Sequence, residues 1–117
     1  MNKETIRIYY NPRCSKCRNT VALVQEHGFN TELIEYLVTP LNITELQSLL
    51  KKLGMKPLEL IRTGEALFKE KYAGRTLSDE EWLDAMVADP ILMERPVVER
   101  GNKAVIARPP EKALALL

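Results

Sequence analysis

The sequence is poor in the residues that build metal sites and disulfide frameworks. Its 117 residues include two cysteines and one histidine. A structural zinc ion takes about four nitrogen or sulfur ligands, so this set is too small and we expect no metal. Two cysteines also do not make the disulfide framework of a small secreted domain. A closely spaced pair instead indicates the reducing cytoplasm, where such cysteines are catalytic or redox-sensing.

Strong net charge and long apolar runs are missing as well. The formal net charge is +1, which provides no bulk attraction to nucleic acid or to an anionic membrane. No run approaches the ~18 apolar residues of a membrane-spanning helix, and residues 1–5 lack the apolar core of a signal peptide. The composition is 45% hydrophobic and 28% charged, which is typical of a soluble globular domain. We therefore expect one cytoplasmic domain over residues 1–117, with no nucleic-acid or membrane partner.

What the sequence does contain is a C-x-x-C motif between a predicted strand and a predicted helix. Residues 6–10 are β-branched and aromatic, which predicts a strand, and Asn11-Pro12 marks a turn. The apolar spacing of residues 15–27 predicts a helix that ends at Gly28. Cys14 and Cys17 therefore fall at a helix N-terminus, where unpaired N–H groups and a partial positive charge stabilise a thiolate.

The predicted nucleophile is Cys14, because it comes first at the open end of the helix. Arg13, Lys16 and Arg18 add positive charge, and such surroundings lower a cysteine pKa from about 8.5 to roughly 3.5–7.5. Cys17 lies three residues on and one turn deeper on the same face, so a disulfide between the two is possible. The alternative is a pair of buried, inert cysteines, but three flanking cations are unusual for such a pair.

The rest of the chain completes an α/β pattern. Residues 31–37 predict a second strand, which with the first strand and helix makes a right-handed βαβ unit. Residues 97–100 and 104–107 predict two short strands joined at Gly101-Asn102, and residues 111–117 predict a final helix. The expected fold is thioredoxin-like: a four-stranded mixed sheet with an all-helical insertion, at about 42–93, between strands 2 and 3.

Capping signals and prolines divide the insertion into helices. Asn42 with Glu45 and Ser78 with Glu81 are spaced as capping boxes. Pro57 is placed to begin a short helix over residues 57–62, and residues 65–71 predict a further one or two turns.

Three arginines stand at separate points of the chain, Arg62, Arg95 and Arg108. Arg95 directly precedes Pro96, and Arg108 also precedes a proline, which favours extended backbone at both arginines. In the thioredoxin architecture the start of the third strand faces the redox cysteine. Arginine presents a planar fork of donors suited to tetrahedral oxyanions, so the three predict an anion site over Cys14. Surface arginines are common, and their spacing leaves an ordinary exposed role open for each.

The chain resembles the arsenate reductase family of glutaredoxin-like fold, often called the ArsC family. The resemblance covers nearly all of the chain. It rests on four stretches of sequence, which are residues 8–20 (IYYNPRCSKCRNT), 60–62 (LIR), 92–98 (LMERPVV) and 107–111 (ARPPE).

The resemblance implies a function and a role for each matched residue. Cys14 matches the family's nucleophile, and Pro96 matches its cis-proline. Arg62, Arg95 and Arg108 match the arginines that bind the oxyanion. The implied activity is reduction of arsenate to arsenite, with glutathione and glutaredoxin supplying electrons and no metal or organic cofactor.

Two departures from the family pattern leave the electron donor and the exact function open. The best-known members have histidine in place of Tyr10 and serine in place of Cys17. A C-x-x-C allows an internal disulfide that thioredoxin or glutaredoxin would reduce. It also allows a general thiol–disulfide oxidoreductase, or a regulator of the Spx type that binds RNA polymerase and uses the pair as a redox switch. Spx-type chains are not known for keeping all three arginines, so the sequence favours the reductase.

Overall fold

The computed structural model describes residues 5–117. Residues 1–4, part of the segment used above to argue against a signal peptide, lie outside the described residues. The chain forms two compact units. The first combines the described residues up to Thr39 with Arg95–Leu117, and the second is Pro40–Glu94. The second unit therefore corresponds closely to the predicted insertion at about 42–93, while the expectation of a single domain stays a prediction.

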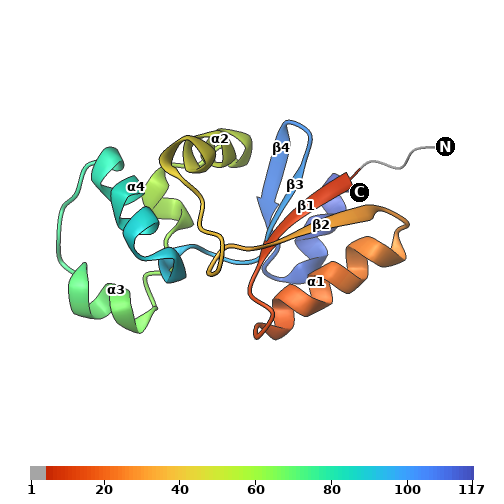
Figure 1. Cartoon of the computed structure of the whole chain (residues 1–117), viewed down its shortest axis with the longest axis horizontal. Coiled ribbons are helices and arrows are strands. Elements are labelled where there is room, and N and C mark those ends of the chain that lie inside the picture. The colour runs from red at the N-terminus through yellow and green to blue at the C-terminus, as the bar shows by residue number, and fades with distance from the viewer. Residues whose placement is uncertain (1–4) are drawn as a thin grey trace. The chain divides into compact units, whose positions relative to one another are not determined.

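The first unit is built on a four-stranded mixed sheet, as predicted (Figure 1). Its strands are β1 (Thr5–Tyr10), β2 (Asn30–Glu35), β3 (Val97–Arg100) and β4 (Lys103–Ile106). Their order is β2-β1-β3-β4, with β1 and β2 parallel and the pairs β1–β3 and β3–β4 antiparallel. This arrangement confirms the thioredoxin-like fold class.

Strand β2 ends two residues earlier than the predicted strand over residues 31–37. Its last residue, Glu35, pairs with Tyr10, and the partner strand stops there because Asn11 and Pro12 follow. The Glu35 carbonyl then accepts hydrogen bonds from the N–H groups of Val38 and Thr39, at 3.0 and 2.8 Å. Those bonds turn the chain away from the sheet.

One face of the sheet carries the core of the first unit. Helix α1 (Ser15–Glu26) and the 3-10 helix η3 (Pro110–Leu116) pack on this face and against each other. The helix predicted over residues 111–117 is thus a 3-10 helix. The core consists of fully buried aliphatic side chains, namely Ile6, Ile8, Val24, Val98, Ala107 and Ala113. Burying each large one stabilises the fold by about 1.5–3 kcal/mol, which fixes α1 on the sheet.

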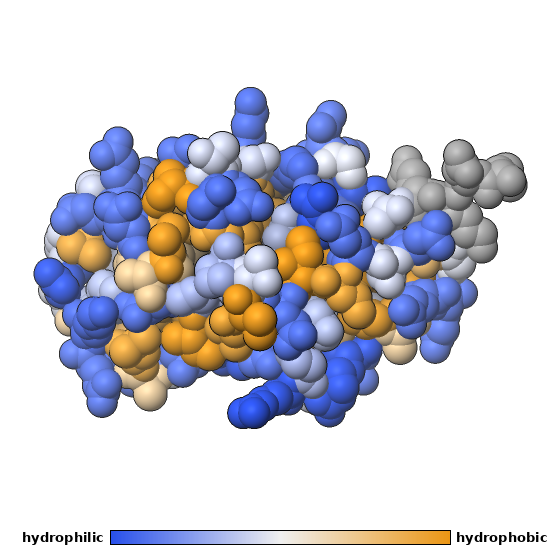
Figure 2. Space-filling model, in the orientation of Figure 1, coloured by the Kyte–Doolittle hydropathy of each residue, from blue (hydrophilic) through white to orange (hydrophobic). Residues whose placement is uncertain are grey.

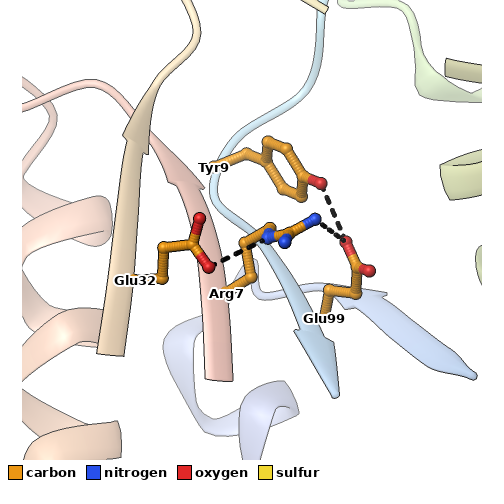
Figure 3. A network of polar contacts seen from close by, with 4 residues as sticks. All are labelled: Arg7, Tyr9, Glu32 and Glu99. Atoms are coloured by element: carbon orange, nitrogen blue, oxygen red, sulfur yellow. Dashed lines mark hydrogen bonds and ion pairs between the residues drawn. The ribbon is translucent and has the colours of Figure 1, made fainter. Parts of the chain in front are cut away.

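A network of polar side chains occupies the other face of the sheet (Figure 3). Arg7 is paired in register with Glu32 on β2 and with Glu99 on β3. The Arg7 Nε lies 3.4 Å from Glu32 Oε2, and Arg7 Nη1 lies 4.0 Å from Glu99 Oε1. The Tyr9 hydroxyl donates to Glu99 Oε1 at 2.8 Å, and burial raises the pKa of Tyr9 to about 12. A buried carboxylate needs such partners, because burying an unpaired charge is costly.

The second unit is helical throughout its regular elements. It contains α2 (Ile43–Leu53), α3 (Ala66–Lys71), α4 (Asp79–Ala88) and two 3-10 helices, η1 (Pro57–Leu60) and η2 (Pro90–Leu92). Both predicted capping boxes are present, at Asn42 with Glu45 and at Ser78 with Glu81. The helix predicted over residues 57–62 is the shorter η1, because Ile61 leaves it for a bridge with Met93.

Around that bridge, two extended segments of the second unit are held together by their backbones. The Arg62 N–H donates to the Leu92 carbonyl at 2.7 Å, and the Glu94 N–H donates to the Leu60 carbonyl at 2.8 Å. Both bonds flank the Ile61–Met93 bridge. The backbone at Arg62 is therefore fixed against the segment that leads directly into Arg95.

Hydrophilic side chains (blue) are interleaved with apolar ones (orange) over the face shown in Figure 2. Val38 is the most exposed large apolar residue of those described, at 74%. Within residues 5–117, none of the helices has both the length and the apolar character needed to cross a membrane.

The buried Tyr9–Glu99 hydrogen bond leads to a prediction about stability. Tyr9→Phe removes the donor to a carboxylate that is 8% exposed, so we expect a loss of about 1–3 kcal/mol in the free energy of unfolding. Urea denaturation measures it. Tyr10→Phe, at the half-buried end of the same strand, is the control and should change stability by about 0.5 kcal/mol or less. Equal effects from the two variants would contradict a stabilising role for this bond.

Candidate active site

The loop between β1 and α1 is closed by its own hydrogen bonds. The Asn11 carbonyl accepts from the Cys14 N–H at 2.9 Å, and the Asn11 side-chain oxygen accepts from the Arg13 N–H at 3.0 Å. The Arg18 guanidinium reaches back from the helix and donates to the Pro12 carbonyl at 3.0 Å. An asparagine side chain that bonds the backbone two residues on is a common way to fix a tight turn. The bond from its own N–H to the Asn11 carbonyl likewise fixes the backbone position of Cys14.

Cys14 is the N-cap residue of α1 rather than a member of its first turn. Its backbone is extended, with φ −89° and ψ 119°, and its carbonyl accepts the first helical bond, from the Arg18 N–H at 3.1 Å. N-cap geometry brings a side chain to the N–H groups of the next two or three residues. The partly exposed Cys14 thiol therefore lies against the unpaired N–H groups of Lys16 and Cys17.

These surroundings lower the pKa of Cys14 below that of an ordinary thiol. Partial burial raises the pKa, but several interactions together outweigh burial. They come from the Cys17 N–H, the Cys17 thiol and the Lys16 N–H, which act on the sulfur from the first turn of the helix, and from the positive charge of Arg108. The side chains of Arg13, Lys16 and Arg18, which the sequence singled out as the source of charge, are exposed. The cation that lowers the pKa of Cys14 is instead Arg108, which follows the last strand, β4.

Cys17 has the opposite character. It is fully buried, and burial raises its pKa to about 12, although a hydrogen bond from the Asn11 backbone lowers it somewhat. Its hydrogen bond to Cys14 and the charge on Cys14 raise its pKa further. The pair is therefore asymmetric, with an accessible, acidic thiol in contact with a buried, protonated one.

Arg95, Pro96 and Arg108 lie in the same unit as the cysteines. The Arg95–Pro96 peptide bond is cis, and so is the Arg108–Pro109 bond. The Arg108 guanidinium donates to the Arg95 carbonyl at 3.2 Å, which links the two segments. Two nitrogen atoms of Arg95, Nε and Nη1, are buried and have no hydrogen-bond partner within residues 5–117. Orphaned buried donors of this kind are rare in proteins and require an explanation.

Arg62 belongs to the second unit, where its Nη1 lies 2.7 Å from Glu65 Oε2. Of the six predicted site residues, the structure thus places five in the first unit. Contacts or charge connect Cys14 with Cys17 and with Arg108, and Arg108 with Arg95. No group of three or more His, Cys, Asp or Glu side chains within residues 5–117 is arranged to hold a metal ion.

Three features of the site were not foreseen from the sequence. Asn11 was identified only as part of a turn, yet its side chain and carbonyl fix the loop. The contact between Arg62 and Glu65 and the second cis peptide bond, at Arg108–Pro109, were also missed. The Arg108-Pro109 pair was visible in the sequence as a second candidate for a cis bond. The Asn11-Pro12 turn before a helix was the signal for the hydrogen-bonded loop.

The fold and the cysteine pair place the chain among the thioredoxin-like proteins. It belongs to the ArsC family, whose family model matches residues 9–116. It is 47% identical over 114 residues to the uncharacterized protein YfgD of Escherichia coli K12, with 96% of each chain covered. It is 39% identical over 115 residues to an arsenate reductase of Haemophilus influenzae, covering 97% of this chain and 99% of the relative.

A solved structure has the same fold as this chain. The arsenate reductase from Vibrio cholerae superposes with a TM-score of 0.95 at 39% identity, covering 99% of this chain and 100% of that one. Near-complete coverage means that both units of this chain have counterparts in that protein.

The surroundings of Cys14 lead to a prediction about its pKa. We expect the rate of alkylation by iodoacetamide to rise with pH around a midpoint below that of a free thiol, which is about 8.5. Mass spectrometry should locate the label on Cys14, because Cys17 is fully buried. Arg108→Ala should raise the midpoint, since it removes a charge that stabilises the thiolate, whereas exposed Arg75→Ala should not. A wild-type midpoint at or above about 8.5 would refute an activated nucleophile.

Proposed function

We propose that this protein is an arsenate reductase that uses Cys14 as its nucleophile and works in the reducing cytoplasm. The observation that carries the proposal is that two buried guanidinium nitrogens of Arg95, Nε and Nη1, have no hydrogen-bond partner within residues 5–117. They lie on the residue whose carbonyl is held by Arg108, and Arg108 in turn acts on the Cys14 thiolate. Relatives named arsenate reductase at 38–39% identity support the same function.

A bound oxyanion would satisfy the two buried Arg95 nitrogens that have no partner among the described residues. Leaving a buried donor unsatisfied costs about 1–3 kcal/mol, and more for a charged group. An arsenate oxygen would satisfy Nε and Nη1 together, because the guanidinium fork matches the spacing of oxygens on a tetrahedral anion. Pro96 fixes the backbone beside this fork, and Arg108 would supply a second positive charge. Arg62, which the family resemblance implies as an oxyanion ligand, is the third arginine in this proposal.

The proposed chemistry has two steps. In the first, the Cys14 thiolate attacks arsenic, a sulfur–arsenic bond forms, and a protonated arsenate oxygen leaves as water. In the second, another thiol attacks the Cys14 sulfur. A disulfide forms, the sulfur–arsenic bond breaks with its electron pair going to arsenic, and arsenite departs. Overall, arsenate and two thiols give arsenite, one disulfide and one water. The arginines stabilise the oxyanion charge, and the lowered pKa of Cys14 increases the fraction of the nucleophile that is thiolate.

The second thiol is Cys17 in this proposal. Its thiol already contacts Cys14, so attack within the chain avoids the entropy of recruiting a partner. The resulting Cys14–Cys17 disulfide is then reduced by a glutaredoxin, by thioredoxin or by glutathione. The same contact supports one alternative function, a thiol–disulfide oxidoreductase that acts on another disulfide and does not need the arginines.

Replacing the arginines of the first unit should separate the two functions. Arg95→Ala or Arg108→Ala should reduce kcat/KM for arsenate about 10-fold to 150-fold, corresponding to about 1.5–3 kcal/mol for one charge-assisted contact. A coupled assay with glutathione and glutaredoxin, repeated with thioredoxin, measures the rate.

Arg75→Ala is the matched control, because Arg75 is an exposed arginine of the second unit, and it should retain wild-type turnover. Comparable activity in all three variants would remove the oxyanion site. Full reduction of a small disulfide by the Arg95 and Arg108 variants, with no arsenate reduction by the wild type, would favour the alternative.

The role of Cys17 predicts a distinct single-turnover result. With arsenate and no glutathione, the wild type should release one arsenite per chain and form the internal disulfide. Cys17→Ser should stall with one Cys14–arsenic adduct and resume when glutathione is added. Arsenite release by the variant at the wild-type rate, without glutathione, would show that Cys17 is not the resolving thiol. Alkylation of Cys14 in the same variant is the control, since the serine hydroxyl still donates a hydrogen bond.

A further inference from the structure

A closed turn brings the side chains of Arg62 and Glu65 together. The Glu65 N–H donates to the Arg62 carbonyl at 3.1 Å, which makes residues 62–65 a hydrogen-bonded β-turn. Glu65 is also the N-cap residue of α3. The turn begins at Arg62, whose N–H is bonded to the Leu92 carbonyl. Backbone hydrogen bonds thus fix the main chain at both residues of the ion pair, independently of the side-chain contact.

This ion pair differs from an ordinary surface salt bridge. Exposed pairs contribute about 0–1 kcal/mol and cost side-chain entropy to order. The side chains of Arg62 and Glu65 are only 22% and 24% exposed, and their contact, Nη1 to Oε2, is short at 2.7 Å. A short contact between two mostly buried, opposite charges strongly restricts the guanidinium.

The contact uses only part of the arginine fork. A guanidinium has five N–H donors, and the carboxylate of Glu65 accepts a hydrogen bond from one of them, on Nη1. The donors on Nε and Nη2 are then held in a fixed direction, and preorganisation of this kind reduces the entropy lost when a ligand binds.

We propose that Glu65 is a positioning residue for oxyanion binding, which holds the Arg62 guanidinium by one edge and leaves the rest of the fork to the anion. This inference rests on the proposed function, because it takes Arg62 as an arsenate ligand. A carboxylate that merely competed with the anion for Arg62 would have the opposite effect, and removing it would tighten binding.

The test measures arsenate affinity by calorimetry in a Cys14→Ser background, where no thioarsenate adduct can form. Glu65→Ala should raise the Kd for arsenate by roughly threefold to tenfold, the size of the cost of ordering one long side chain. Glu65→Gln keeps an acceptor oxygen for Arg62 and removes the negative charge, so its Kd should be equal to or lower than that of the background. Glu70→Ala, which removes an exposed carboxylate from the same helix α3, is the matched control and should leave the Kd unchanged.

A double-mutant cycle shows whether Glu65 acts through Arg62. In an Arg62→Ala background, adding Glu65→Ala should produce no further weakening. The inference is overturned if Glu65→Ala binds as tightly as Glu70→Ala, if it binds more tightly than the background, or if it weakens binding equally without Arg62. Thermal denaturation of every variant identifies any that fails to fold. If Glu65→Ala does not fold, the Kd of Glu65→Gln is compared with that of the background instead.

The failure of this inference is distinguishable from failure of the proposed function. Absence of arsenate binding in the Cys14→Ser background itself, with Glu65 and Arg62 intact, would refute the oxyanion site as a whole. Binding that responds to Arg95→Ala but not to Glu65→Ala would keep the proposed function and remove only the positioning role.

Discussion

The hydrogen bonds that the Asn11 loop makes are the constraint on which the candidate site depends. Strand β1 lies between β2 and β3, and the loop at its carboxyl end must reverse the chain into α1 within four residues. The Asn11 carbonyl accepts a hydrogen bond from the Cys14 N–H, and the Asn11 side-chain oxygen accepts one from the Arg13 N–H. These two bonds close the turn. Cys14 is thereby held at the N-cap, where helix N–H groups and the Arg108 charge stabilise its thiolate. A looser turn would move the Cys14 thiol away from these groups, and its pKa would be higher.

The two faces of the sheet divide structure from chemistry in the first unit. The aliphatic face fixes α1 through buried side chains such as Ile8 and Val24, and with it the direction of the helix end. The opposite face places charged groups in register, and Glu99 there has both Tyr9 and Arg7 as partners. Arg95 contrasts with this satisfied network, because its buried Nε and Nη1 have no partner within residues 5–117. This contrast supports the proposal that the two Arg95 nitrogens bind a ligand.

The sequence predicted the fold class, both capping boxes and the succession of helices and strands along the chain, because the signals for these elements are local. Periodicity, caps and turn residues act over a few positions, so Asn42, Ser78 and Gly101-Asn102 were informative by themselves. Contacts between distant segments were not readable in this way. The sequence placed Arg108 in an anion site over Cys14, but it did not identify Arg108 as the cation that lowers the pKa of Cys14, because that depends on how β3 pairs with β1 and β4 with β3. The end of β2 at Glu35 likewise depends on where its partner strand stops. Arg62 and Glu65 are three residues apart, but their pairing requires a turn rather than a helix.

The contact between the cysteines reconciles two demands on Cys17 that first seem opposed. A thiol with a pKa of about 12 stays protonated, so it can donate a hydrogen bond to the Cys14 thiolate, but it is a poor nucleophile, because the thiolate is the reactive form. Part of that high pKa comes from Cys14 itself, through its charge and its hydrogen bond. Once Cys14 is bonded to another atom, its thiolate charge is gone and that part disappears, while the Asn11 backbone N–H still favours a Cys17 thiolate. Cys17 would therefore stabilise the nucleophile before it reacts, and would become easier to deprotonate only after the adduct has formed.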